Sequence, residues 1–278
     1  MKFSIVTPSF NCARWLPQCV ASVADQAVDL EHFVQDGGST DGTLDWLAGR
    51  TGLHVQVAED AGMYDAINRG FERGDGELCA YLNCDEQYLP GALTAVHAHF
   101  AADPKTDVLF AHTVGIDAQG GFVCHRKALV PQRDHTLLCH LATLSAATFF
   151  RRRLLDAGHR FDPAYRAAGD VDWIARMLSA NVQMRVLDRF TSVFTFTGDN
   201  LSRSDIAVAE QSRLRGMLPG WRRILRPAVS MHHRLRKWVA GAYRQKAFEY
   251  AVYVPEDDQR RKLFSSGPCP SWRWPTSR

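Results

Sequence analysis

Two neighbouring carboxylates follow an apolar segment in the stretch CAYLNCDEQYLPGAL, which spans residues 79–93. Asp85 and Glu86 stand directly after the apolar run, and a Pro-Gly turn closes the stretch. Like charges at adjacent positions repel each other unless a cationic group lies between them or in front of them. The pair therefore indicates a site for a positively charged partner at the mouth of a buried strand.

Two more polar clusters stand at the ends of short apolar runs, so that residues 9–11, 36–39 and 83–86 form three such clusters. These runs alternate with segments that have helical spacing. The pattern predicts strands over 2–10, 30–38, 54–60 and 77–83, and helices over 13–26, 39–50 and 62–74. Such alternation is typical of an α/β fold with a parallel sheet and helices on both faces. Ligands bind at the carboxyl ends of the strands in these sheets, so we expect the three clusters to meet in one crevice.

The pattern loosens after residue 105. It predicts a hairpin over 107–127, a strand and a short helix over 140–158, a helix over 167–181 and a loop over 198–203. Asp170 and Asp172 stand near the start of the last helix. Two residues on a helix diverge by about 200° around its axis, so only one of the two carboxylates can point into the crevice.

Composition narrows the class of protein. A chain of 278 residues with 46% hydrophobic residues can bury one large core with a smaller appendage. Its seven cysteines form no CxxC pair, which argues against a disulfide framework or a zinc site and favours a reduced, cytoplasmic protein. We expect no signal peptide, and the longest uncharged run, residues 135–150, is too short and polar to span a bilayer.

Positive charge is concentrated towards the C-terminal end. The net charge is +3, but residues 211–248 contain no Asp or Glu and contribute +10, so the rest carries −7. This segment holds an apolar helical stripe flanked by Arg and Lys: Leu235, Trp238, Val239, Ala242 and Tyr243. An anionic membrane surface fits the stripe, and so does packing against the rest of the protein or a second subunit. We divide the chain into a domain over 1–210 and a basic, amphipathic helical tail over 211–278, and we expect no nucleic-acid partner.

Five motifs occur in a characteristic order: VTPSFN, QDGGSTDGT, EDAGMYDAINRG, YLNCDE and AGDVDW. Over residues 2–205 the chain thereby resembles family 2 glycosyltransferases, which are inverting enzymes with the GT-A fold that use nucleotide-sugar donors. The form GMYDAINRG is most similar to bacterial enzymes that build surface polysaccharides. The resemblance implies transfer of a sugar, from a UDP-sugar in first place, to a hydroxyl of a glycan or lipid-linked acceptor.

The resemblance also implies roles for individual residues on the donor side. Asp85, with Glu86, would bind Mg²⁺ or Mn²⁺, which neutralises the charge that develops on the leaving diphosphate. Asn83, at a position where the family usually has Asp, would contact the ribose. The other residues implied to bind the nucleotide-sugar are Thr7, Ser9, Asp36, Asp65, Asn68 and Arg69.

On the acceptor side, an inverting displacement needs a general base. By resemblance Asp170 is this base and Asp172 has a supporting or helix-capping role, although Gly169 stands where the family commonly has Glu. His140 and Thr143 resemble a segment that lines the acceptor site, and Arg176 is expected to pair with Asp170 or with a phosphate. Residues 198–202 correspond to a loop that covers the site in related enzymes.

Three alternatives use the same residues differently. A calcium loop in DGGSTDG is excluded because its twelfth position is Leu47 instead of Glu. A nucleotide-sugar or glycan-binding homologue without activity would explain Asn83 but not the retention of Asp170. A nucleotidyltransferase would need a Gly-rich loop with Arg or Lys after the first strand, and TPSFNCARW supplies Arg14 but no Gly. An oligomer is compatible with the sequence.

Overall fold

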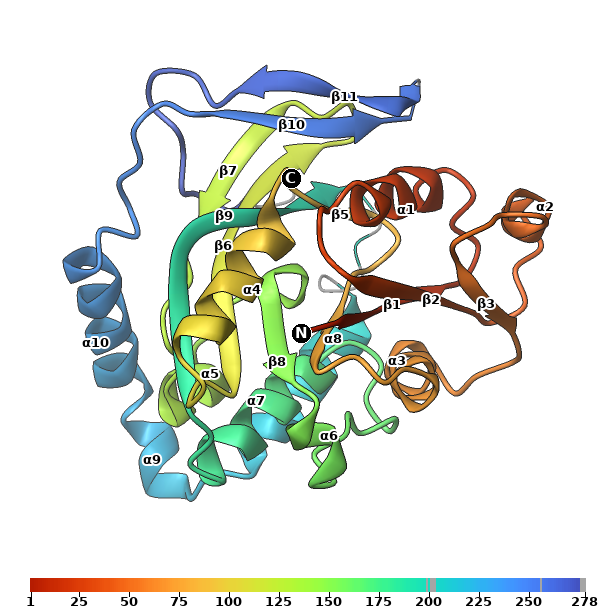
Figure 1. The fold of residues 1–278 in the computed structure, drawn as a ribbon. Helices are drawn as coiled ribbons and strands as arrows, with labels where there is room; N and C mark the ends of the chain where they lie inside the picture. Colours follow the sequence, from red (N-terminus) through yellow and green to blue (C-terminus); the bar gives the residue numbers. More distant parts are fainter. Residues whose placement is uncertain (199, 201–203, 256, 276–278) are drawn as a thin grey trace.

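The computed structural model describes residues 1–198, 200, 204–255 and 257–275. Its main sheet has the strand order β3-β2-β1-β4-β8-β6-β9-β5, with β7 paired to β6 (Figure 1). The fold class predicted from strand–helix alternation is confirmed, because helices cover both faces of this sheet. The sheet is mixed rather than all parallel, since β8 runs antiparallel to β4 and β6.

The N-terminal half contains the predicted parallel strands. They are β1 (Phe3–Ser9), β2 (Leu30–Asp36), β3 (His54–Val57) and β4 (Leu78–Tyr81), connected by α1 (Leu16–Ala24), α2 (Thr43–Leu47) and α3 (Met63–Arg73). Ser9 pairs with Asp36 at the last position of the β1–β2 ladder. Two of the predicted polar clusters therefore lie side by side at the carboxyl edge of the sheet.

The middle of the chain completes the sheet. It contains β5 (Glu86–Tyr88), α4 (Ala92–Ala102), β6 (Val108–Asp117), β7 (Phe122–Arg126), α5 (Arg133–Leu138), η1 (Ser145–Ala147), β8 (Thr148–Arg151), α6 (Arg153–Asp156), α7 (Gly169–Ser179) and β9 (Met184–Phe196). The hairpin predicted over 107–127 is confirmed as β6 and β7. The helix predicted over 167–181 is α7, which brings Asp170 to a helix N-terminus.

Side chains alternate between two cores because successive residues of a strand point to opposite faces. Phe3 and Ile5 of β1 pack with buried residues of α1 and α4, whereas Val6 packs with buried residues of α3 and α7. Figure 1 shows α1 and α3 on opposite sides of β1 and β2. This two-sided burial fixes the strand ends, and thus the polar loops that follow them.

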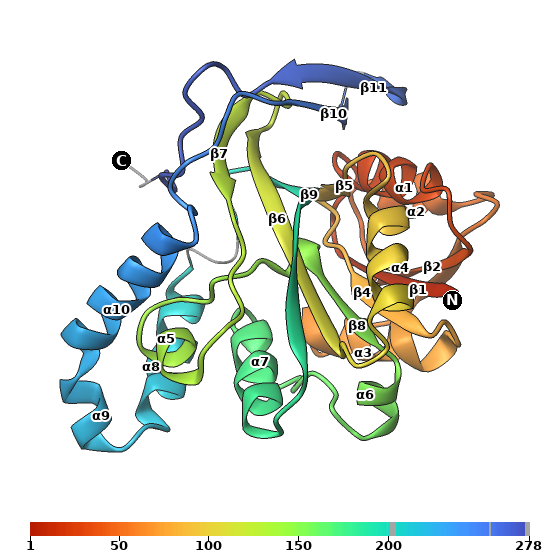
Figure 2. The same ribbon diagram turned by 60° about the vertical axis from the view of Figure 1, so that its left-hand side comes forward.

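The C-terminal segment contains α8 (Asp205–Gly216), α9 (Gly220–Ile224) and α10 (Arg226–Val239), followed by β10 (Glu249–Val254) and β11 (Asp257–Ser265). The tail predicted to be helical over 211–278 therefore ends in an antiparallel hairpin instead of a helix. The hairpin lies across α1, where Arg261 and the Tyr253 hydroxyl both bind the Asp25 carboxylate. Figure 2 shows α10 beside α5, on the side away from β1 and β2.

Helix α10 is amphipathic with its polar side inward. His233 and Lys237 are buried, whereas apolar residues of α9 and α10 are more than half exposed: Trp221, Ile224, Met231, Leu235, Trp238 and Val239. Within the described residues, no helix is long and apolar enough to cross a membrane. The predicted stripe is therefore divided, with Leu235, Trp238 and Val239 facing outward and Ala242 buried.

Candidate functional site

Asp36 is held in one orientation at the end of β2. Its Oδ2 accepts hydrogen bonds from Ser9 Oγ and Ser39 Oγ, both at 2.8 Å. Its Oδ1 accepts from the backbone N–H groups of Gly38 and Ser39, at 2.9 and 2.8 Å. The structure thus brings Asp36 and Ser9 together. Thr7 is fully buried and its hydroxyl lies 2.8 Å from His32 Nε2, so its side chain contributes to the interior beneath this site.

Asn68 and Arg69 of α3 stand three and four positions after Asp65, and the three predicted residues make different contacts. Asp65 forms an ion pair with Arg69 at 2.8 Å and accepts a hydrogen bond from Ala61 N. Asn68 makes two hydrogen bonds with the backbone of Phe161, at 2.8 and 3.1 Å. Asn68 therefore fixes the segment that leads to α7, while Asp65 and Arg69 stay on the more exposed side.

The acidic cluster after β4 is strongly desolvated. Glu86 is 1% exposed, and its Oε2 accepts a hydrogen bond from Asn83 N at 3.0 Å. Burial, the charge of Asp85 and the charge of Asp170 raise the pKa of Glu86 well above its ordinary value. Burial also raises the pKa of Asp85 to about 6, although Asp85 Oδ2 accepts a hydrogen bond from Asn200 Nδ2 at 3.2 Å.

The residues of this cluster fit a divalent cation that is shared with a ligand. Asn83 Oδ1 and Glu86 Oε1 are buried and have no hydrogen-bond partner among the described residues. Mg²⁺ and Mn²⁺ prefer oxygen ligands, and Mg²⁺ commonly binds one or two carboxylates together with substrate phosphates. The described part of the chain contains no group of three or more His, Cys, Asp or Glu that could hold a metal by itself. A cation here would therefore take further ligands from a bound diphosphate.

Asp170 stands at the beginning of α7 and contacts Tyr64 of α3. The Tyr64 hydroxyl donates to Asp170 Oδ1 at 3.4 Å and accepts from Asp170 N at 3.1 Å. Val171 N donates to the same Oδ1 at 2.8 Å. Burial of the carboxyl group raises the pKa of Asp170 to about 6. A carboxylate with a pKa in this range is suited to accept a proton near neutral pH.

The structure explains why residue 169 is Gly, although the resemblance suggests Glu at this position. A Cβ atom on residue 169 would lie 2.6 Å from Cε2 of the Tyr64 ring. A side chain there would displace the ring that contacts Asp170. Tyr64 was missed by sequence reasoning, although it stands inside the motif GMYDAINRG.

Asp172 points away from Asp170, as the helical spacing predicts. It is 6% exposed and accepts a hydrogen bond from Arg176 Nε at 2.8 Å. The expected pairing of Arg176 with Asp170 is wrong, because the i,i+4 spacing places Arg176 beside Asp172. Both residues line a separate pocket of about 310 Å³ near Leu214 of α8.

Glu210 of α8 is a second residue that sequence reasoning missed. Its carboxylate accepts hydrogen bonds from the backbone N–H groups of Arg166, Ala167 and Ala168 at 2.6, 2.9 and 2.8 Å. These three residues precede α7 directly, so Glu210 fixes the segment from which Asp170 projects. No local pattern signals this contact, since the partners are more than 40 positions apart.

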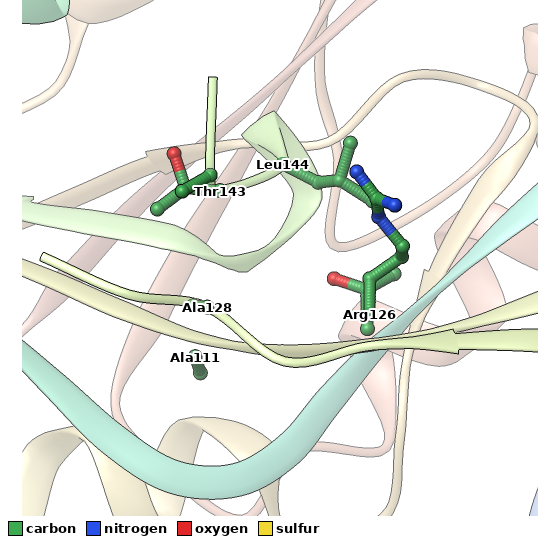
Figure 3. A pocket seen from close by; sticks show the side chains of 7 residues that line it. Ala111, Arg126, Ala128, Thr143 and Leu144 are labelled. Atoms are coloured by element: carbon green, nitrogen blue, oxygen red, sulfur yellow. The ribbon is translucent and has the colours of Figure 1, made fainter. Parts of the chain in front are cut away.

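His140 and Thr143, two of the predicted acceptor-side residues, do not line the pocket of Asp172 and Arg176. His140 is exposed, but its Nε2 lies 2.6 Å from Lys237 Nζ and 3.2 Å from His233 Nε2. Thr143 lines a narrow pocket together with Arg126 and Leu144 (Figure 3). Of the predicted covering loop, residues 199 and 201–203 lie outside the described residues, and Asn200 contacts Asp85.

Known proteins resemble this chain in sequence. The family model described as "Glycosyl transferase family 2" matches residues 4–160. A PGL/p-HBAD biosynthesis glycosyltransferase of Mycobacterium bovis is 31% identical over 188 residues, which cover 64% of this chain and 70% of the relative. The chondroitin synthase of Escherichia coli is 28% identical over 125 residues, covering 43% of this chain and 18% of that protein.

Solved structures show the same fold. TarS of S. aureus in complex with UDP-GlcNAc superposes with a TM-score of 0.62 at 21% identity, covering 86% of this chain and 73% of TarS. A mannosyltransferase of Pyrobaculum calidifontis in complex with GDP-Man and Mn²⁺ gives a TM-score of 0.54 at 14% identity, covering 84% and 75% of the two chains. The likeness to these structures shows the GT-A fold, and the family match over more than half of the chain shows that the chain belongs to glycosyl transferase family 2 and is a glycosyltransferase.

Proposed function

We propose that the protein is an inverting glycosyltransferase of bacterial polysaccharide biosynthesis. It transfers a sugar from a UDP-sugar to a hydroxyl group of a glycan or lipid-linked acceptor. The observation that carries this proposal is the arrangement of polar groups at the carboxyl ends of the strands. Ser9 and Ser39 hold the Asp36 carboxylate at the end of β2, and Asn83 Oδ1 and Glu86 Oε1 after β4 are buried without a partner among the described residues. The charges of Asp85 and Asp170 also raise the pKa of Glu86.

Relatives support the donor and the cation. TarS is solved with UDP-GlcNAc, and the Pyrobaculum mannosyltransferase with GDP-Man and Mn²⁺. In this chain Ser9 and Asp36 would orient the nucleotide base, Asn83 would bind the ribose, and Asp65 and Arg69 would line the diphosphate. Asn68 instead fixes the segment that leads to α7, because both polar atoms of its side chain bind the Phe161 backbone. Asp85 and Glu86 would hold Mn²⁺ or Mg²⁺, which neutralises charge on the leaving diphosphate when it is bound.

Asp170 acts as the general base in this proposal. Its carboxylate takes the proton of the acceptor hydroxyl while the hydroxyl oxygen attacks the anomeric carbon from the side opposite the diphosphate. Tyr64 and Val171 N hold Oδ1, so the other carboxylate oxygen is left for the acceptor. Glu210 supports the same geometry because it binds the three backbone N–H groups before α7.

The surface of α9 and α10 suggests where the enzyme works. Trp221, Ile224 and Trp238 are 61%, 79% and 62% exposed, and basic residues accompany them: Arg222, Arg223, Arg226 and Arg234. Apolar side chains flanked by Arg fit the anionic inner face of a membrane, where the aromatic rings insert and the cations meet lipid phosphates. We therefore expect a cytoplasmic protein that binds the membrane peripherally through residues 211–248.

The test of the proposed function is the stereochemistry of the product. The protein is incubated with Mn²⁺, a lipid-linked or oligosaccharide acceptor and either UDP-glucose or UDP-GlcNAc, and the new linkage is assigned by proton NMR. An inverted anomeric configuration with release of UDP is expected. Retention of configuration would contradict the mechanism. Donor binding without turnover would favour a binding homologue, and pyrophosphate release would favour a nucleotidyltransferase.

A further inference from the structure

Two cysteines from different loops meet at the carboxyl edge of the sheet. Cys12 lies in the loop after β1, and Cys84 stands between Asn83 and Asp85 in the acidic cluster after β4. The two thiol groups lie within hydrogen-bonding contact of each other. Cys12 also packs against the small apolar cluster that contains Cys84. The fold therefore brings together two thiols that are far apart in the sequence.

The end of β1 holds both thiols at neighbouring points. Cys84 Sγ lies 3.1 Å from the backbone oxygen of Pro8, and Cys12 Sγ lies 3.4 Å from the backbone oxygen of Phe10. The backbone of Cys12 is anchored as well, because its N–H group donates to Thr43 Oγ1 at 3.1 Å. The contact between the thiols is thus part of the ordered structure of this edge.

The two thiols differ in accessibility and in acidity. Cys84 is 3% exposed, whereas Cys12 is partly exposed to solvent. The hydrogen bond with Cys84 lowers the pKa of the Cys12 thiol, although burial alone would raise it. An accessible thiol of lowered pKa is the first to react with an oxidant, and a second thiol beside it then condenses with the oxidised sulfur. Cys12 and Cys84 match these two roles.

Other cysteines of the chain lack this combination. Cys19 is fully buried, its thiol lies 3.6 Å from the Thr7 hydroxyl, and burial raises its pKa. Cys79 is fully buried in the core beside α3, and burial raises its pKa to about 12. Cys269 is exposed in the C-terminal segment, far from β1 in the sequence. Oxidation that ends in a disulfide should therefore be selective for Cys12 and Cys84.

We propose that Cys12 and Cys84 form a reversible disulfide that regulates the acidic cluster after β4. Hydrogen peroxide converts the Cys12 thiol to a sulfenic acid, and one water molecule is released. The Cys84 thiol then attacks the oxidised sulfur, so that the S–S bond forms, the S–O bond breaks and a second water molecule leaves. A thiol reductant reverses the reaction by thiol–disulfide exchange.

The disulfide changes the surroundings of the candidate cation ligands. An S–S bond is about 2.0 Å long, which is shorter than a contact between two thiols, so Cys84 moves towards the loop after β1. Cys84 also loses the proton that it shares with Pro8 O. Asn83 and Asp85 flank Cys84 directly and move with it, and metal affinity depends on how ligands are oriented. This consequence for the cation rests on the proposed function, whereas formation of the disulfide does not.

The first measurement locates the disulfide. Reduced protein is treated with a small excess of hydrogen peroxide, the remaining thiols are alkylated, and the protein is digested with trypsin without reductant. Cleavage after Arg14 separates Cys12 from Cys19. Mass spectrometry should find peptide 3–14 joined to peptide 74–105, with fragmentation placing the bond at Cys84 and dithiothreitol removing it. Pairing of Cys12 with another cysteine, or no disulfide of Cys12 when Cys269 is oxidised, would overturn the proposal.

The second measurement tests regulation. UDP binding in the presence of Mn²⁺ is measured by calorimetry on wild type, Cys12→Ser and the matched control Cys269→Ser, each reduced and oxidised. We expect oxidation to lower the affinity about tenfold or more in wild type and control, with recovery after reduction, and to leave Cys12→Ser unchanged. Equal affinities of reduced and oxidised wild type, or the same loss in Cys12→Ser, would overturn regulation by this pair. If reduced wild type does not bind UDP while the disulfide forms, the proposed function fails and the disulfide stands.

Discussion

The carboxyl edge of the sheet and the inner face of α10 are two polar centres of opposite charge with different kinds of compensation. At the edge, four hydrogen bonds hold Asp36, and three backbone N–H groups from the segment before α7 bind Glu210. Around α10, Lys237 reaches only a histidine nitrogen as hydrogen-bond acceptor among the described residues. The comparison teaches that Asp36 and the segment before α7 are held in place by the protein itself, whereas Lys237 has no acidic partner among the described residues.

The largest effect is expected from the loss of the candidate general base. Asp170→Asn should lower the single-turnover rate of transfer by a factor of about 10²–10⁴, because the general base is lost. Donor affinity should stay close to wild type, since Asp170 is placed on the acceptor side. Asp172→Asn is the matched control on the same helix, and its effect should fall on stability because Asp172 pairs with Arg176. Equal losses of rate and donor affinity in Asp170→Asn would remove the base assignment.

The acidity of the same centre gives a second prediction. Burial raises the pKa of Asp170 to about 6, so kcat/KM should fall about tenfold for each pH unit below this value as the base becomes protonated. Stability should respond in the opposite direction. The folded state holds the protons of Asp85 and Asp170 more tightly than the unfolded state, so stability decreases as pH rises from about 4 to about 6.

Rate profiles and thermal unfolding, the latter without metal or nucleotide, check these two trends between pH 4 and 8. Parallel trends in rate and stability would show that loss of folded protein explains the pH profile. Opposite trends support Asp170 as a buried base. The Asp170→Asn protein should lose part of the stability trend and keep the part that Asp85 contributes.

A smaller effect is expected from packing at Gly169. Gly169→Ala should destabilise the fold by about 1–3 kcal/mol, because the new methyl group would overlap the Tyr64 ring. Transfer should slow as well, since the ring holds Asp170. Gly216→Ala is the control, because a Cβ atom at residue 216 would meet no other atom within 4 Å. Gly158→Ala is unsuitable, because the φ of +86° at residue 158 would strain any side chain. Equal stability of both variants in denaturant titration would show that Tyr64 moves freely.

The smallest effect on the fold should come from the outer face of α10. Trp238→Ser should leave the free energy of unfolding within about 0.5 kcal/mol of wild type, because the side chain is 62% exposed. Sedimentation with vesicles of an anionic phospholipid should drop clearly. Phe10→Ser, at a side chain that is also 62% exposed but lies in the β1–α1 loop, is the control. Unchanged sedimentation of Trp238→Ser would favour contact with another protein chain.

The contrast between the two centres also explains what could be predicted from the sequence. The carboxyl edge is built from strand ends, so the alternation of apolar runs was sufficient to bring Ser9 and Asp36 together. Asp170 and Asp172 were separated correctly because helical spacing is a local property. Arg176 was expected to pair with Asp170 or with a phosphate, whereas its partner in the structure is Asp172 at i,i+4 spacing.

Contacts over long sequence distances escaped prediction. Glu210 binds backbone groups of residues 166–168, and Tyr253 contacts Asp25 across 228 positions. Neither contact leaves a periodic pattern. The sequence predicts the apolar stripe on α10 but not which way it faces. The stripe faces outward because the opposite side of the helix contacts His140 through His233 and Lys237. Contacts between α10 and the rest of the protein bury its polar side chains, although an amphipathic helix usually buries its apolar side.

The most direct test of the central claim is a titration of the protein with UDP in the presence and absence of Mn²⁺, repeated for Asp85→Asn. We expect that wild type binds UDP more tightly with Mn²⁺ than without it, and that Asp85→Asn binds UDP equally in both conditions. This result would assign the acidic cluster after β4 to a cation shared with the diphosphate. Two results would contradict the account: a UDP affinity of wild type that is the same with and without Mn²⁺, or an increase in the UDP affinity of Asp85→Asn by Mn²⁺ that is as large as in wild type.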